Sequence, residues 1–127
     1  MLESDIVAHC APTLAGIKTA NMFNYLPDDM EKLHQEIQEE NCKLNSKGVY
    51  VEILRTGEKR ALIYVYRKNR LEADLNRKGA ESILQTCGYE CGETDCCLRK
   101  LQERFFQYEC FPHEVGLFLG YPLDDVA

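Results

Sequence analysis

"VYVEILRTGEKRALIYVY", residues 49–66, decides the fold, because it holds two apolar runs on either side of a turn. Residues 49–54 (VYVEIL) and 60–66 (RALIYVY) are rich in β-branched and aromatic side chains, which are typical of strands. Residues 56–59 (TGEK) join them. A link of this length that contains a glycine predicts an antiparallel hairpin.

The second strand of this hairpin is apolar on both faces. Alternate positions of a strand share a face. In the first strand, one face carries Val49, Val51 and Ile53. In the second strand, one face carries Ala61, Ile63 and Val65, and the opposite face carries Leu62, Tyr64 and Tyr66. A strand that is apolar on both faces is covered on both faces. We therefore expect the second strand at the centre of a sheet, with a layer on each side.

The chain before the hairpin predicts a strand and a long helix. Ser4 can cap one short helical turn, and residues 15–24 predict a strand, with a helix capped by Thr13 as the alternative. Pro27 at a first helical position begins a clear helix, which Gly48 ends. A strand therefore precedes the hairpin in this interpretation, and a helix separates the two.

The chain after the hairpin predicts helices only. Residues 71–84 carry leucine and isoleucine at helical spacing and predict one helix, weakened by Gly79. Thr94 caps the next helix, and residues 112–120 form a short one. This order indicates a single α+β domain over residues 1–127. It has a small, mostly antiparallel sheet of about three strands packed with about four helices.

The charge of the chain disfavours some partners. Its 127 residues include 15 basic and 21 acidic side chains, for a formal charge of −6. A general nucleic-acid binder needs a positive face, so nucleic acid is a disfavoured partner. No apolar run approaches the roughly 20 residues of a membrane span, and the acidic N-terminus lacks the basic region of a secretory signal. These features predict a cytoplasmic protein.

The seven cysteines are the most unusual part of the composition. A reducing cytoplasm disfavours a disulfide framework, which leaves apolar core residues, metal ligands or redox thiols. Cys91 lies in a glycine-flanked loop, and Cys97 falls in the first turn of a predicted helix, where the dipole favours a thiolate. These two are the better functional candidates, although burial as small apolar side chains is the commoner role of a free cysteine.

Two further pairs could contribute to a site. His9 and Cys10 are neighbours, and on an extended segment their side chains would point to opposite faces. His113 and Glu114 stand at the start of the short helix 112–120, where they could act as base, ligand or cap, but they do not form an H-E-x-x-H motif.

Basic residues form a second kind of candidate site. Residues 55–78 hold eight basic and three acidic side chains. Arg67, Lys68 and Arg70 follow two tyrosines at the end of the second hairpin strand, and Lys18 follows the small residues of PTLAG. These four cations could hold an anionic ligand, although a solvated strand end is the commoner explanation.

Three stretches together resemble an uncharacterised bacterial family, domain of unknown function 3793: HCAPTLAGIK (9–18), GYECGETDCCL (88–98) and FPHEVGLFLGYPLDDV (111–126). The resemblance singles out His9, Cys10, Cys91, Cys97, His113 and Glu114, and it implies no mechanism. It also implies a further strand and a cysteine-bearing helix after residue 126. We therefore expect a short or truncated form, whose exposed sheet edge would favour self-association.

Two functional hypotheses follow. In the first, the six residues that the resemblance singles out form a metal-binding centre for zinc or iron, or a thiol-redox centre with a redox partner. Glu114 would orient the ligating side chains without itself binding the metal. In the second, the cysteines are structural and the protein is a non-catalytic binding module for an anionic ligand or a protein partner. Lys18, Arg67, Lys68 and Arg70 would then carry the binding.

Overall fold

A three-stranded antiparallel sheet divides the protein into two helical layers. The computed structural model describes residues 2–57, 60–77, 79–86, 88–89, 94–107 and 114–120. The strands are β1 (Ala20–Tyr25), β2 (Val49–Thr56) and β3 (Ala61–Arg67), in the order β1-β3-β2. The hairpin and the central position of its second strand are thus confirmed, as is the α+β class.

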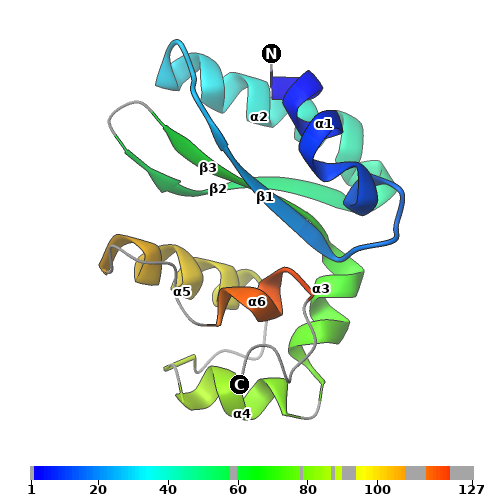
Figure 1. Cartoon of the computed structure of the whole chain (residues 1–127), viewed down its shortest axis with the longest axis vertical. Coiled ribbons are helices and arrows are strands. Elements are labelled where there is room, and N and C mark those ends of the chain that lie inside the picture. The colour runs from blue at the N-terminus through cyan, green and yellow to red at the C-terminus, as the bar shows by residue number, and fades with distance from the viewer. Residues whose placement is uncertain are drawn as a thin grey trace.

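One helical layer covers each face of the sheet (Figure 1). Helices α1 (Leu2–Leu14) and α2 (Met30–Leu44) lie on one side. On the other lie α3 (Lys68–Leu75), α4 (Ala80–Thr86), α5 (Thr94–Gln107) and α6 (Val115–Phe118). No helix within the described residues is long and apolar enough to cross a membrane.

The two faces of β3 build two separate cores. The α1–α2 core consists of Leu2, Ile6, Cys10, Phe23, Leu33, Val49, Val51, Ala61, Ile63 and Val65. The α3–α6 core includes Leu62, Tyr64, Tyr66, Leu71, Leu98, Leu101, Phe105 and Phe118. The alternation read from the sequence therefore assigns the central strand correctly, and both faces of that strand exclude water.

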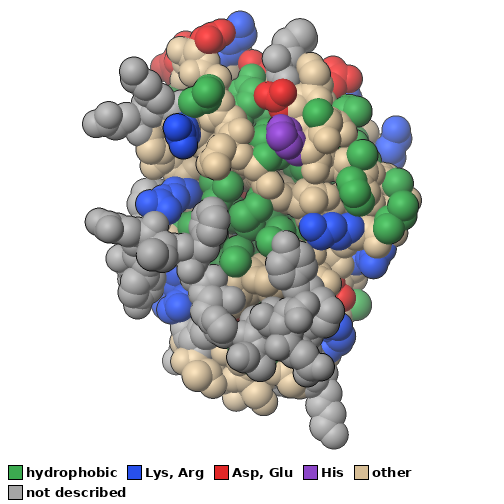
Figure 2. All heavy atoms as spheres, viewed as in Figure 1, with side chains coloured by type: hydrophobic (Ala, Val, Ile, Leu, Met, Phe, Trp, Pro, Cys, Tyr) green, Lys and Arg blue, Asp and Glu red, His purple; other side chains and the backbone are tan. Residues whose placement is uncertain are grey.

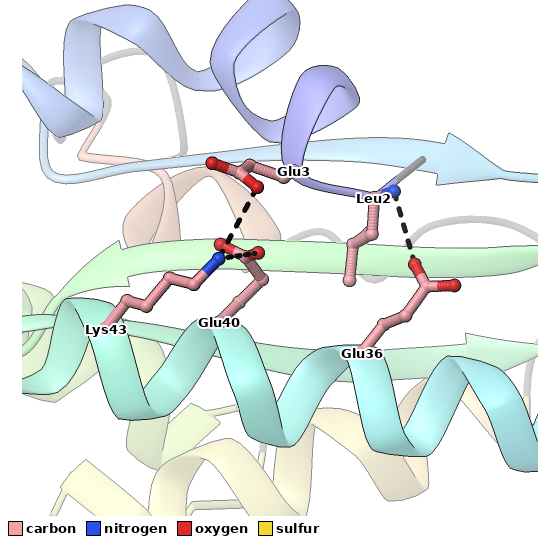
Figure 3. Close-up of polar contacts among 5 residues, drawn as sticks. All are labelled: Leu2, Glu3, Glu36, Glu40 and Lys43. Carbon is pink, nitrogen blue, oxygen red and sulfur yellow. Dashed lines mark hydrogen bonds and ion pairs between the residues drawn. The ribbon is translucent and has the colours of Figure 1, made fainter.

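Contacts between polar side chains join α1 to α2 at the edge of their layer (Figure 3). The ammonium of Lys43 lies 3.4 Å from a carboxylate oxygen of Glu3 and 3.6 Å from one of Glu40. The backbone N–H of Leu2 donates to Glu36 Oε2 at 3.2 Å. These contacts fix the start of α1 beside the middle and the end of α2.

Some predicted boundaries before the hairpin are wrong. Residues 2–14 are helical, so the expected strand over 15–24 is shortened to β1, and Thr13 lies in the last turn of α1 instead of capping a helix. Asp29, and not Pro27, precedes the second helix: its carboxylate accepts the Glu31 N–H at 3.1 Å. A side-chain acceptor at that position satisfies a backbone donor of the first turn, which proline does not do.

The single helix expected over residues 71–84 is two helices, α3 and α4. Gly79 lies between them with φ of +99°, a backbone conformation that favours glycine and that no α-helix contains. The predicted start of the last helix at Pro112 lies outside the described residues. Gly120, with φ of +82°, follows α6 as expected.

Candidate functional site

Cys10 is a core residue in this structure. Its side chain lies in the α1–α2 core and is fully buried, at a kink where α1 leaves helical geometry (φ −118°). Burial raises the pKa of its thiol to about 12, and the positive charge of Lys18 offsets only part of that effect. A thiol that stays protonated at neutral pH is a poor nucleophile and a poor metal ligand.

His9 is exposed whereas Cys10 is buried, and the segment is helical and not extended. The imidazole is exposed and stacks on the ring of Phe23, with the ring centroids 5.0 Å apart and the planes 14° from parallel. Packing of this kind covers one side of a β1 aromatic ring. The structure therefore does not bring the His9–Cys10 pair together as a site.

Cys97 and Glu114 lie on the other side of the sheet. Cys97 is buried in the α3–α6 core, so β3 and its neighbours separate it from Cys10. Glu114 is fully buried, accepts a hydrogen bond from the Tyr89 hydroxyl at 2.8 Å and forms an ion pair with Arg104. A buried carboxylate needs such partners, and here they fix the start of α6 against α5.

The six residues proposed for a metal or redox centre are therefore not gathered in the described part of the chain. Cys91 and His113 lie outside the described residues, and the four others divide between the two sides of the sheet. Within the described residues, no three histidine, cysteine, aspartate or glutamate side chains lie close enough to hold a metal ion.

Two of the four predicted anion-binding cations are engaged with the backbone. The guanidinium of Arg67 donates from Nε to Thr13 O and from a terminal nitrogen to Leu14 O, both at 2.7 Å. Arg70 donates to Gly16 O in the loop that follows. The last carbonyls of a helix lack partners within it, so these arginines hold the end of α1 against β3 and α3.

The basic side chains do not form one continuous patch on the face of the molecule in Figure 2, among the residues that the structure describes. Figure 2 shows lysine and arginine side chains scattered over this view, while most of the carboxylates gather above the sheet. Lys18 is half-buried, and its charge acts on Cys10. The predicted basic face is thus divided among separate local roles.

Lys68 differs from these, because it borders a cleft. The cleft has a volume of about 330 Å³ and lies between β2, the end of β3 and the first half of α5. The residues that line it are Tyr50, Glu52, Tyr66, Lys68, Asp95, Leu98, Arg99 and Gln102. We call it the β2–α5 cleft.

The walls of the β2–α5 cleft include a stack of tyrosine rings. Tyr50 stacks on Tyr66 with centroids 5.7 Å apart, and Tyr66 stacks on Tyr64 at 4.9 Å. The Lys68 ammonium lies over the Tyr50 ring, 5.4 Å from its centroid. This distance is within the range of a cation–π interaction, so Lys68 covers part of the Tyr50 ring at the wall of the cleft.

Both charge signs are present in the cleft. Lys68 and Arg99 are its cations, and Lys68 pairs with the exposed Asp95 at 4.0 Å. Burial raises the pKa of the Glu52 carboxyl, and the negative charge of Asp95 raises it further. The Gln102 side chain donates to Ile53 O at 2.8 Å, which ties α5 to the edge of β2.

Sequence reasoning missed most of this cleft. Tyr50 and Glu52 alternate with the apolar residues of β2, so their common face could have been found from the pattern. Arg99 and Gln102 lie on α5, far along the chain, and only the packing of α5 against β2 brings them to the same place. Lys68 is the one residue of the cleft that the basic pattern had singled out.

Comparison with known proteins gives one match. A family model described as "Protein of unknown function (DUF3793)" matches residues 6–127. No curated protein and no solved structure matches the chain.

Proposed function

The chain belongs to the DUF3793 family of proteins of unknown function, and we propose from its own side chains that it is a non-catalytic binding module. Its ligand is a small molecule with an anionic group and a planar ring, bound in the β2–α5 cleft. The volume of about 330 Å³ suits a molecule of that size.

The observation that carries this proposal is the position of Lys68 over Tyr50. The ammonium and the ring face lie 5.4 Å apart at the wall of one cleft. A ligand anion can contact the Lys68 ammonium while the ligand ring packs against the tyrosines that line the cleft, and Arg99 is a second cation in the same lining. Ring and charge would then be recognised together.

Asp95 does not prevent an anion from binding there. It contacts Lys68 only at 4.0 Å, and its side chain is 65% exposed. Exposed ion pairs contribute little to stability, so a ligand anion can replace Asp95 beside Lys68 at small cost. Burial raises the pKa of Glu52, so at a pH close to that pKa a smaller fraction of this carboxyl is ionised than of an ordinary glutamate.

The cysteines are structural in this proposal. Cys10 and Cys97 fill the two cores, on opposite sides of the sheet. Cys10, Cys42, Cys96 and Cys97 are free thiols, which supports a reducing compartment such as the cytoplasm. A zinc, iron or thiol-redox centre is the alternative proposal, and it would depend on Cys91 and His113.

An NMR titration with three probes tests the proposal. Phenyl phosphate carries both a ring and an anion, while phenol and inorganic phosphate each carry one of them. We expect phenyl phosphate to shift the backbone amides of Tyr50, Glu52 and Gln102 saturably, and each of the other probes to bind these residues more weakly. Shifts of equal affinity with all three probes, or no saturable shifts, would overturn it.

A metal count on the same protein tests the alternative. Elemental analysis after anaerobic purification without a histidine tag would detect zinc or iron. About one metal ion per chain, lost in Cys97→Ser but retained in Cys42→Ser, would favour the metal centre over a purely structural role of Cys97.

A further inference from the structure

A second cleft lies at the turn end of the hairpin, and its lining differs entirely from that of the β2–α5 cleft. It has a volume of about 350 Å³ and is lined by Asn24, Arg55, Gly57, Arg60 and Leu62. We call it the hairpin-end cleft. None of these residues was a candidate site residue in the sequence patterns.

Strand register builds this cleft. Asn24 of β1 and Arg55 of β2 are both paired with Leu62 of β3, so three neighbouring side chains stand in a row across the sheet. Leu62 is buried at the centre of the row and belongs to the α3–α6 core. The row therefore lies on the face that carries α5, with leucine as the floor.

A β-bulge turns Arg55 onto this face. The register of β2 against β3 shifts between Ile53 and Arg55: Ile53 pairs with Ile63, and Arg55 pairs with Leu62. Strict alternation would place Arg55 on the same face as Ile53, which packs against the α1–α2 core. Bulges re-aim side chains in this way and are enriched beside functional sites.

The lining is positively charged. Two guanidinium groups and one side-chain amide surround the leucine floor, and no carboxylate is among the described residues that line the cleft. The Gly57 N–H donates to Arg60 O at 2.8 Å, which closes the turn at this end of the sheet.

We propose that the hairpin-end cleft binds the phosphate group of a small phosphate monoester. Guanidinium groups match the geometry of phosphate oxygens and can donate two hydrogen bonds to them. The net charge of −6 disfavours an extended polyanion such as nucleic acid. The leucine floor and the volume of about 350 Å³ leave room for an organic group on the ester oxygen.

This site does not rest on the proposed function of the β2–α5 cleft, because the two clefts share no lining residue. Methyl phosphate is the probe, since it has a phosphate monoester and no ring. We expect it to shift the backbone amides of Asn24, Gly57 and Leu62 saturably in an NMR titration. Sodium chloride at matched ionic strength should not reproduce these shifts.

Four variants at three exposed positions complete the test. Arg60→Gln removes one guanidinium and should weaken binding about tenfold. Asn24→Asp places a carboxylate in the cleft and should weaken binding at least as much, whereas Asn24→Ala should have a smaller effect. Arg77→Gln, which removes an arginine between α3 and α4, is the matched control and should leave the affinity unchanged.

The opposite results would overturn the proposal. These are an absence of saturable shifts at the three amides, equal shifts with chloride, or affinities of Arg60→Gln and Asn24→Asp that equal that of the wild type. Circular dichroism of each variant would establish that it is folded before its affinity is compared.

Discussion

The side-chain amide of Asn41 pairs with the backbone of Val51 like a short piece of strand. The Val51 N–H donates to Asn41 Oδ1 at 2.8 Å, and Asn41 Nδ2 donates to Val51 O at 3.0 Å. Gln102 contacts the next outward carbonyl, that of Ile53. Two amides, from α2 and α5, thus cover the free edge of β2, which would otherwise present unpaired backbone groups.

Replacement of Asn41 should destabilise the protein. Asn41→Ala removes both hydrogen bonds and leaves the part-buried N–H and C=O of Val51 without these partners. The free energy of unfolding should fall by about 1–3 kcal/mol. Urea unfolding would measure the loss. Gln38→Ala, at an exposed position of the same helix, is the control. Equal stability of the two variants would contradict the role given to this amide.

Lysine at position 67 should not stabilise the end of α1 as well as Arg67 does. The guanidinium contacts Thr13 O and Leu14 O with two nitrogens, each at 2.7 Å, and a single ammonium does not offer that fork. We expect Arg67→Lys to lose about 1–3 kcal/mol and to speed amide exchange in the last turn of α1. Arg70→Lys, whose arginine makes one contact with Gly16 O, should lose less. The reverse order would refute this account.

Cys10 should resist alkylation in the folded protein. Burial raises the pKa of its thiol to about 12, so at pH 8 the thiolate is scarce and inaccessible. We expect iodoacetamide to modify Cys10 at least about a hundredfold more slowly than the exposed Cys42, as followed by peptide mass mapping. Modification of both at similar rates would argue for a reactive Cys10 and for the redox alternative.

Glu52 should make stability fall as the pH rises. Burial, with the charge of Asp95, raises the folded-state pKa of this carboxyl above its ordinary value of 4.5. The folded protein therefore holds the proton to a higher pH than the unfolded chain, and stability is lost as the pH rises through that window. Lys68 and Arg99 are the other charged side chains that line the same cleft.

Glu52→Gln removes this titration. The variant should gain stability relative to the wild type at pH 7, and the gain should shrink toward pH 4, where the native carboxyl is protonated. Urea unfolding at both values would measure it, with Glu72→Gln at an exposed site of α3 as the control. A gain that does not depend on pH would mean that the carboxyl charge is not its cause.

The hairpin was predictable because its signal is local. Alternation over residues 49–53 and 61–66 assigns each side chain to a face without knowledge of the rest of the chain. Only one short turn of the N-terminal helix was predicted, because the helix contains Pro12 and a kink at Cys10, both of which disfavour a regular helix. Pro12 lies in the last turn, and the kink is held by packing of Cys10 in the α1–α2 core.

The site was less predictable, because it depends on tertiary approach. A row of basic residues at the end of β3 predicts an anion site, but carbonyl oxygens at the end of α1 and in the loop after it engage Arg67 and Arg70. Spacing likewise gave no indication that Cys10 and Cys97 face opposite sides of one sheet. Lys68 is the predicted cation that borders the β2–α5 cleft and its aromatic wall.

Calorimetric titration with phenyl phosphate, on the wild type and two lysine variants, tests the β2–α5 cleft most directly. Lys68→Gln removes the cation over Tyr50, and Lys47→Gln removes an exposed lysine before β2. We predict that Lys68→Gln binds at least about tenfold more weakly than the wild type, and that Lys47→Gln binds within about twofold of it. Equal affinities for the wild type and both variants would contradict the proposal that this cleft binds the ligand.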